Sequence, residues 1–103
     1  MECPDCGERM DTALVIETED EQRPVYTDHQ WWRCDCGARV FAVLVEDKTN
    51  IFNDDLDHRG YRPDPEAWER TRQAASACSS PRDKSCRCPV HQSPPRCWGA
   101  QVW

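Results

Sequence analysis

Apolar positions in this chain gather into three short runs, all within the first 46 residues. The first run covers residues 13–16, the second ends at Trp31 and Trp32, and the third covers residues 39–46 and is rich in β-branched and aromatic residues. Runs of this length and composition predict strands. Because a short turn separates the second run from the third, we expect a hairpin with the first strand beside it, which makes a three-stranded antiparallel sheet.

The rest of the chain is more polar. Residues 47–63 show no apolar periodicity and are predicted to be a linker or a draped loop. A helix is predicted to begin at Asp64, with Asp64 as N-cap, Pro65 at the first helical position and Glu66 in the first turn, and to end near residue 77 or 78. The prolines and the glycine after residue 86 predict no long element there. We therefore divide the chain into residues 1–46, 47–63 and 64–103.

Eight cysteines in 103 residues change this picture, because six of them form close pairs. The pairs are Cys3/Cys6, Cys34/Cys36 and Cys86/Cys88, and glycine follows the first two pairs directly. A glycine can take a positive φ and close a tight turn, so that two thiolates face one ion. This pattern predicts bound metal. Because only 38% of the residues are hydrophobic, the apolar core must be small, and metal coordination would supplement it.

Disulfides are the alternative use of these cysteines. The chain begins Met1-Glu2-Cys3 without a basic and apolar leader, and no stretch reaches the roughly 20 apolar residues of a membrane span. We therefore expect a cytoplasmic, reduced protein with no membrane partner, in which clustered cysteines indicate metal.

The first predicted site consists of Cys3, Cys6, Cys34 and Cys36. The 27 residues between Cys6 and Cys34 are enough for one strand out and one strand back. The Cys-Pro-Asp-Cys-Gly sequence at residues 3–7 resembles the knuckle of the zinc-ribbon family, and Trp32-Arg33-Cys34 is also typical of that family. The resemblance covers residues 1–46 and implies a structural zinc ion held by an antiparallel sheet. The chain departs from the family at Cys34-Asp-Cys36, where one residue rather than two separates the cysteines.

The second predicted site draws on five candidate ligands for four positions. The preferred set is Cys78, Cys86, Cys88 and His91, and Cys97 is an alternative to His91. A site of three cysteines and one histidine would be closed and structural. The cofactor prediction is thus two zinc ions. Iron is the rival metal, because rubredoxins also use Cys-x-x-Cys-Gly pairs, although they use two of them and the Cys34/Cys36 spacing breaks that pattern.

The net charge of −6 is distributed unevenly. Residues 1–57 carry 15 acids and 5 bases, a net charge of −10, whereas residues 58–103 carry 4 acids and 8 bases, a net charge of +4. Phosphate backbones would be repelled by the first part and tolerated by the second. Nucleic acid is therefore a possible partner only through residues 58–103. The acidic run at residues 17–21 is expected to be a solvated loop, with a phosphate mimic as the sharper hypothesis.

The tryptophans suggest a protein partner. Trp31 and Trp32 are adjacent, so on a strand they point to opposite faces. Trp98 and Trp103 lie in a proline-rich tail that either folds back over the sheet, which we favour, or binds another protein. Tryptophan beside arginine is typical of interface hot spots. The candidate partner-binding residues are Trp31, Trp98, Trp103 and Arg96.

Catalysis is not expected. No nucleophile–base pair, phosphate loop or open metal site can be identified, so we predict neither a catalytic residue nor a small-molecule substrate. The sequence Asp57-His58 in a thiolate-rich chain resembles the HNH nucleases, but no matching downstream asparagine follows.

These observations favour a small metal-stapled α+β protein: a three-stranded zinc ribbon, one helix and a C-terminal zinc knuckle. The predicted function is a non-enzymatic zinc-binding interaction module or adaptor within a larger protein or nucleoprotein assembly. A nucleic-acid-binding zinc ribbon is the first alternative, and an HNH-like metal-dependent nuclease is the second.

Overall fold

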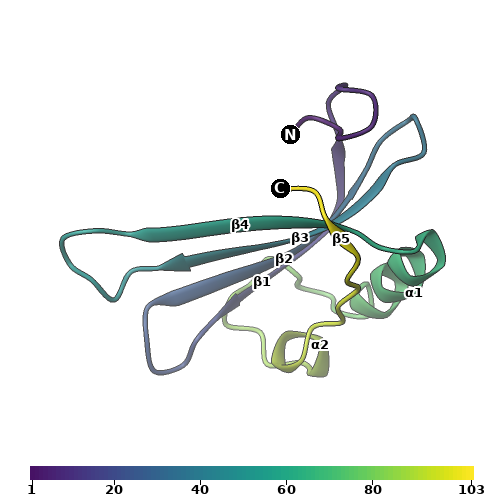
Figure 1. Ribbon diagram of the computed structural model, residues 1–103. Coiled ribbons are helices and arrows are strands. Elements are labelled where there is room, and N and C mark those ends of the chain that lie inside the picture. The colour runs from purple at the N-terminus through teal and green to yellow at the C-terminus, as the bar shows by residue number, and fades with distance from the viewer.

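A computed structural model describes residues 1–103 as one antiparallel sheet with two helices beside it (Figure 1). The sheet has the order β1-β2-β3-β4-β5. Its strands are β1 (Asp11–Glu19), β2 (Val25–Arg33), β3 (Arg39–Asp47), β4 (Asp55–Arg62) and β5 (Ala100–Gln101), and the helices are α1 (Pro65–Ala75) and α2 (Pro89–Gln92). The predicted α+β class is confirmed, with five strands in the sheet rather than three.

The first three strands form the predicted meander. Strands β2 and β3 pair without interruption from Val25↔Asp47 to Arg33↔Arg39, and the Cys34/Cys36 turn joins them. Strand β1 pairs with β2 on the other side, with a bulge between Thr12 and Leu14. The β-branched and aromatic content of the apolar runs therefore predicted these strands correctly.

Strand β4 corrects the prediction that residues 47–63 are a linker or draped loop. Residues 55–62 pair with β3 from Asp47↔Asp55 to Phe41↔Tyr61. The strand has no apolar alternation because only Gly60 in it is buried. Its backbone pairs with β3 while most of its side chains face solvent, so a pattern of buried positions could not predict it.

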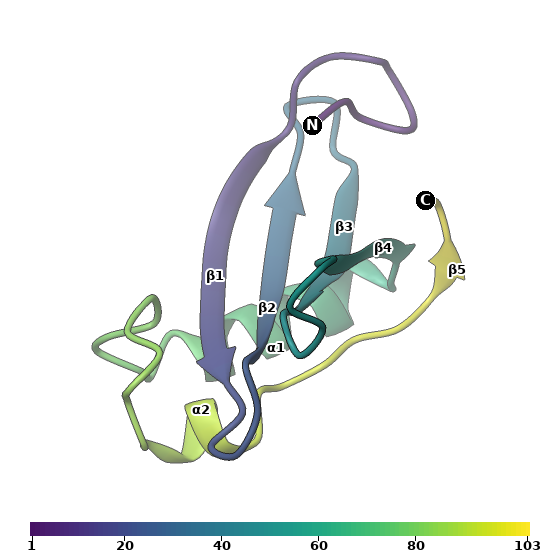
Figure 2. The ribbon, with the colours of Figure 1, turned by 90° about the vertical axis from the view of Figure 1, so that its left-hand side faces the viewer.

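Helix α1 begins as predicted. The Asp64 side chain accepts a hydrogen bond of 2.9 Å from the backbone N–H of Glu66. The helix ends at Ala75, slightly earlier than expected, and buries Trp68 and Ala75. The Trp68 indole donates to the carbonyl of Val40 at 3.1 Å, which fixes the helix against β3. Figure 2 shows α1 crossing behind the first three strands and α2 near the end of β1.

The core is small and divided into two clusters, with 19 of 103 residues buried. The larger cluster lies under α1 and contains Ile16, Trp31, Phe41, Trp68, Ala75, Cys78 and Cys97. The smaller cluster contains Cys3, Met10, Cys34, Ala38 and Val40. Each cluster includes two buried cysteines, and at least one of them belongs to a predicted ligand group. A metal ion that holds these thiols together would therefore also stabilise the packing of the apolar cluster.

The C-terminal tail folds back over the sheet, as favoured above. Strand β5 pairs with the end of β4, and the Trp103 ring packs edge-on against His58 with a centroid distance of 5.8 Å. Val102 donates its N–H to the carbonyl of Gly60 at 2.8 Å. Gly60 permits this contact, because an added Cβ there would lie 2.3 Å from the Trp103 ring.

Replacing Gly60 by alanine should displace Trp103. We expect Gly60→Ala to lower the free energy of unfolding by about 1–2 kcal/mol, the usual cost of overpacking, and to shift tryptophan emission to the red. Urea titration with fluorescence detection measures both effects. In a Trp103→Ala background the same change should cost little. An equal cost in that background would refute the steric explanation.

His29 is an unusual core residue. Its side chain is 2% exposed, and neither ring nitrogen has a hydrogen-bond partner. Burial first, and the positive charge of Arg96 second, lower the pKa of His29 to about 4. The unfolded chain, with a pKa near 6.5, therefore binds more protons between pH 6.5 and pH 4, and stability falls as the pH drops through that window.

Replacing His29 by leucine should remove this pH dependence. We expect His29→Leu to be as stable as the wild type or slightly more stable at pH 7.5, because no buried polar atom is left unpaired. At pH 5.5 its advantage should grow by about 1 kcal/mol. Urea unfolding of both proteins at both pH values measures the difference between their free energies of unfolding. The cysteine groups are the same in both proteins, so their contribution to the pH dependence cancels in this difference. A constant difference between the two proteins would refute a neutral buried His29.

Neither helix has the length and apolar composition needed to cross a bilayer.

Candidate metal centres

The first group of ligands forms where the N-terminal turn meets the β2–β3 turn. Cys3 and Cys6 lie on the former, and Cys34 and Cys36 lie on the latter. The four sulfur atoms all lie within 4.8 Å of one another. The Sγ atoms of Cys3 and Cys36 are 3.6 Å apart, and those of Cys6 and Cys34 are 3.5 Å apart. A tetrahedron with metal–sulfur bonds of about 2.3 Å has sulfur–sulfur edges of about 3.8 Å, so this group can hold one metal ion.

Glycines shape both turns of this group. Gly7 has a φ of 76° and Gly37 a φ of 100°, a region that other residues rarely adopt. Gly7 donates its N–H to the carbonyl of Cys3 at 2.9 Å, and Gly37 donates to that of Cys34 at 3.0 Å. The shortened Cys34-Asp-Cys36 pair thus still turns both sulfurs toward the first pair.

The thiols of this group differ in acidity. Burial opposes ionisation of Cys3, but hydrogen bonds from the backbone of Asp5 and Cys6 and from the Cys36 thiol lower its pKa to about 7. The pKa of Cys6 shifts in the opposite direction. A hydrogen bond from the backbone of Glu8 lowers this pKa, but the Cys34 thiol and burial together raise it to about 12. Without a cation, neighbouring thiolates repel one another, so full ionisation of the group needs a positive ion.

The second group lies at the opposite end of the molecule (Figures 1 and 2). Cys78 follows α1, and Cys86, Cys88 and His91 come from α2 and the segment before it. All four ligand atoms lie within 4.8 Å of one another. The Cys78 sulfur is 3.9 Å from that of Cys86 and 3.2 Å from Nδ1 of His91, and the Cys88 sulfur lies 3.5 Å from the same nitrogen. This group of three cysteines and one histidine can also hold one metal ion.

His91 rather than Cys97 completes this group. Cys97 is 4% exposed and lies in the larger core cluster, where its sulfur accepts a hydrogen bond of 3.3 Å from the Thr71 hydroxyl. The hydrogen bond with His91 lowers the pKa of Cys88 to about 6, so one thiolate is available at neutral pH. All eight cysteines are free, and the sulfur–sulfur separations are far above the roughly 2.05 Å of a disulfide.

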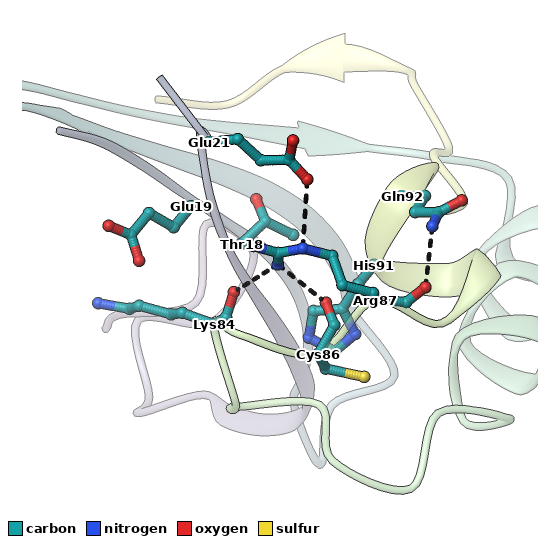
Figure 3. Close-up of a pocket in the computed structure, with 8 residues that line it drawn as sticks. All are labelled: Thr18, Glu19, Glu21, Lys84, Cys86, Arg87, His91 and Gln92. Atoms are coloured by element: carbon teal, nitrogen blue, oxygen red, sulfur yellow. Dashed lines mark hydrogen bonds and ion pairs between the residues drawn. The ribbon is translucent and has the colours of Figure 1, made fainter. Parts of the chain in front are cut away.

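A shallow pocket of about 250 Å³ lies beside the second group, between the end of β1 and α2 (Figure 3). Arg87 spans it: the guanidinium pairs with Glu21 at 3.2 Å and donates to the carbonyls of Lys84 and Cys86 at 3.3 Å. Gln92 donates to the carbonyl of Arg87 at 2.9 Å. The contacts of Arg87 beside this pocket thus tie the acidic β1–β2 loop to the C-terminal segment.

The acidic run at residues 17–21 is not a loop throughout, because residues 17–19 belong to β1, and most of its charge is paired within the chain. Glu17 pairs with Arg82 at 3.5 Å, and Asp20 pairs with Arg23 at 3.8 Å. With the Glu21 pair, three of its four carboxylates have an arginine partner. A phosphate mimic would need a row of unpaired carboxylates, and this run does not offer one.

The partner-binding candidates fall into different environments. Trp31 is fully buried and donates its indole N–H to Thr71 at 3.0 Å, so it belongs to the core and offers no exposed surface to a partner. Trp98 packs edge-on against Tyr61 and Phe41, with centroid distances of 5.0 and 5.6 Å, yet remains 53% exposed. Trp103 lies over Gly60, as described above. Arg96 lies 5.9 Å from the Trp98 ring.

His58 has structural contacts. Its Nε2 lies 3.1 Å from the side-chain oxygen of Gln30, its ring meets Trp103, and the neighbouring Asp57 pairs with Arg59 at 3.0 Å. These contacts hold the imidazole against the sheet and the C-terminal tail.

The most exposed large apolar side chains lie elsewhere, at Ile51 and Phe52 on the β3–β4 turn. Neither residue was predicted as functional from the sequence. The available signal was an adjacent apolar pair in an otherwise polar stretch.

Comparison of the chain with protein-family models, with curated proteins and with solved structures finds no match. The likeness to zinc ribbons therefore consists of the N-terminal knuckle and the ligand geometry, and no family is assigned.

Proposed function

We propose that the protein is a cytoplasmic, non-enzymatic interaction module held together by two structural zinc ions. The observation that supports this most directly is the presence of two four-ligand groups at opposite ends of one small sheet. Four protein ligands around one ion leave no open position for water or substrate, as is usual in structural sites. Zinc suits both donor sets, the four thiolates and the three thiolates with one imidazole, whereas a mononuclear iron site of the rubredoxin type needs four thiolates.

A protein partner fits the surface charges better than nucleic acid does. Five of the eight basic side chains in residues 58–103 lie within 4.0 Å of a carboxylate of the same chain. These arginines cannot all contact phosphates without first giving up their own partners. The positive charge that is free to bind nucleic acid is therefore smaller than the composition of residues 58–103 suggests. The contacts of His58 with Gln30 and Trp103 likewise favour a structural histidine over a nuclease base.

Affinity purification of the metal-loaded chain from its source cells tests this function. We expect a protein partner in stoichiometric amount that stays bound after nuclease treatment and at high salt. Loss of all retained material on nuclease treatment, together with retardation of oligonucleotides that declines steeply with salt, would favour the nucleic-acid alternative. Cleavage of DNA that needs Mg²⁺ and is lost in His58→Ala would favour the nuclease.

A further inference from the structure

The turn between β3 and β4 exposes the most apolar surface of the molecule. Ile51 is 88% exposed and Phe52 is 90% exposed, and Leu56 at the start of β4 is 67% exposed. We call residues 48–54 the hairpin tip; it projects away from both cysteine groups and from the helices (Figure 1). Single exposed apolar residues are common, but neighbouring large ones at a protruding turn mark interaction sites.

The hairpin tip has a defined shape. The carboxylate of Asp47 accepts hydrogen bonds from the N–H of Thr49 at 2.9 Å and from its hydroxyl at 2.5 Å. The side chain of Asn50 accepts from the N–H of Phe52 at 2.9 Å, and Lys48 donates its N–H to the carbonyl of Pro24 at 2.9 Å. These turns hold the two apolar side chains outward before any partner arrives, which reduces the entropy lost on binding.

Negative charge surrounds the apolar pair. Residues 46–57 contain five acids and one base, a net charge of −4. The base, Lys48, is paired with Glu46 at 3.3 Å. Asp54 and Asp55, which follow Phe52 closely, form no ion pair within the chain. A partner must therefore offer an apolar surface with positive charge at its edge.

Three other occupants fit less well. A membrane surface attracts basic segments and repels this acidic one. A second copy of the chain has seven of its thirteen basic side chains already paired, and two acidic tips repel each other. Strand addition along the open edge of β4 is opposed by the charged residues Asp55, Asp57 and Arg59.

We propose that the hairpin tip inserts Ile51 and Phe52 into an apolar pocket, rimmed by lysine or arginine, on a different protein. This inference names the contact surface of the interaction module and so rests on the proposed function. Phe52 is the central anchor, and the flanking aspartates contribute orientation and association rate.

Photocrosslinking at the tip identifies the partner, and binding of the two purified proteins decides the question. A benzophenone amino acid in place of Asn53 is activated in the source cells, and the crosslinked protein is identified and purified. We expect Phe52→Ser to weaken binding by about 30-fold or more, as for an aromatic hot spot, and Phe52→Leu to weaken it far less. Asp54→Asn with Asp55→Asn should reduce the association rate and its salt dependence. Both apolar residues are exposed, so circular dichroism should show unchanged folding in every variant.

The results separate this inference from the proposed function. A partner that binds Phe52→Ser as tightly as the wild type would overturn the tip and leave the interaction module intact. The absence of any partner would overturn both. Crosslinks within a homodimer, binding of anionic vesicles through Phe52, or crosslinks to RNA would each replace the proposed occupant and so refute the inference.

Discussion

Removal of both metal ions is expected to unfold the whole chain. Only 19 residues are buried, and each of the two core clusters includes cysteines of one ligand group. Structural zinc contributes about 10–16 kcal/mol of binding free energy at neutral pH, which matches or exceeds the roughly 5–15 kcal/mol by which small domains are stable. A strong zinc chelator under reducing conditions should therefore abolish the strand signal in circular dichroism, and added zinc should restore it.

The matched control for this experiment is a chelator that binds calcium and magnesium but spares zinc, which should leave the spectrum unchanged. A chain that keeps its spectrum and its cooperative unfolding after all metal is removed would show that the apolar clusters suffice. In that case the cysteine groups would not be structural staples.

Substitution of single cysteines should separate ligands from core residues. Cys78→Ala removes a ligand of the second group, so we expect the metal content to fall from two ions to one and the segment after α1 to lose its order. Cys97→Ala removes a sulfur from the core next to Thr71 and should keep both ions, at a cost of about 1 kcal/mol. Native mass spectrometry gives the metal count, and amide hydrogen exchange shows which residues lose protection.

The comparison is well matched because the two cysteines have similar burial, 6% exposed for Cys78 and 4% for Cys97, and belong to the same cluster. A loss of one ion in both variants would place Cys97 in the coordination sphere. A loss in neither variant would mean that the second group does not bind metal.

Local patterns predicted the elements that depend on local chemistry. The apolar runs indicated β1, β2 and β3, and the Asp64-Pro65 start indicated α1. Strand β4 could not be found this way, because its pairing is made by the backbone and only Gly60 is buried. Strand β5 has two residues and depends on long-range pairing with Tyr61 and Arg62.

The ligand groups could be predicted because thiol pairs with short spacing leave few geometric options. The choice between His91 and Cys97 could not be made from spacing, since both follow Cys88 at distances that the chain can bridge. The fold decides it, because it places His91 beside the sulfurs of Cys78 and Cys88 and places Cys97 in the core. Similarly, adjacent tryptophans must face opposite sides of a strand, but the position of α1 decides that Trp31 is the buried one.

In the proposed function, metal ions bound by the two ligand groups at opposite ends of the sheet supplement a core of only 19 buried residues. The β3–β4 turn contains none of the ligands of either group. On this account the metal ions affect partner binding only through the fold. Variants at the hairpin tip should therefore change affinity without changing metal content.

The metal content of freshly purified protein, combined with a count of reactive thiols under native conditions, shows whether both ligand groups hold structural zinc. We expect two zinc ions per chain and almost no rapidly reacting thiol, because seven cysteines bind zinc and Cys97, outside both coordination spheres, is only 4% exposed. A folded protein that contains no metal, with its cysteines either all reactive or all in disulfides, would contradict this expectation.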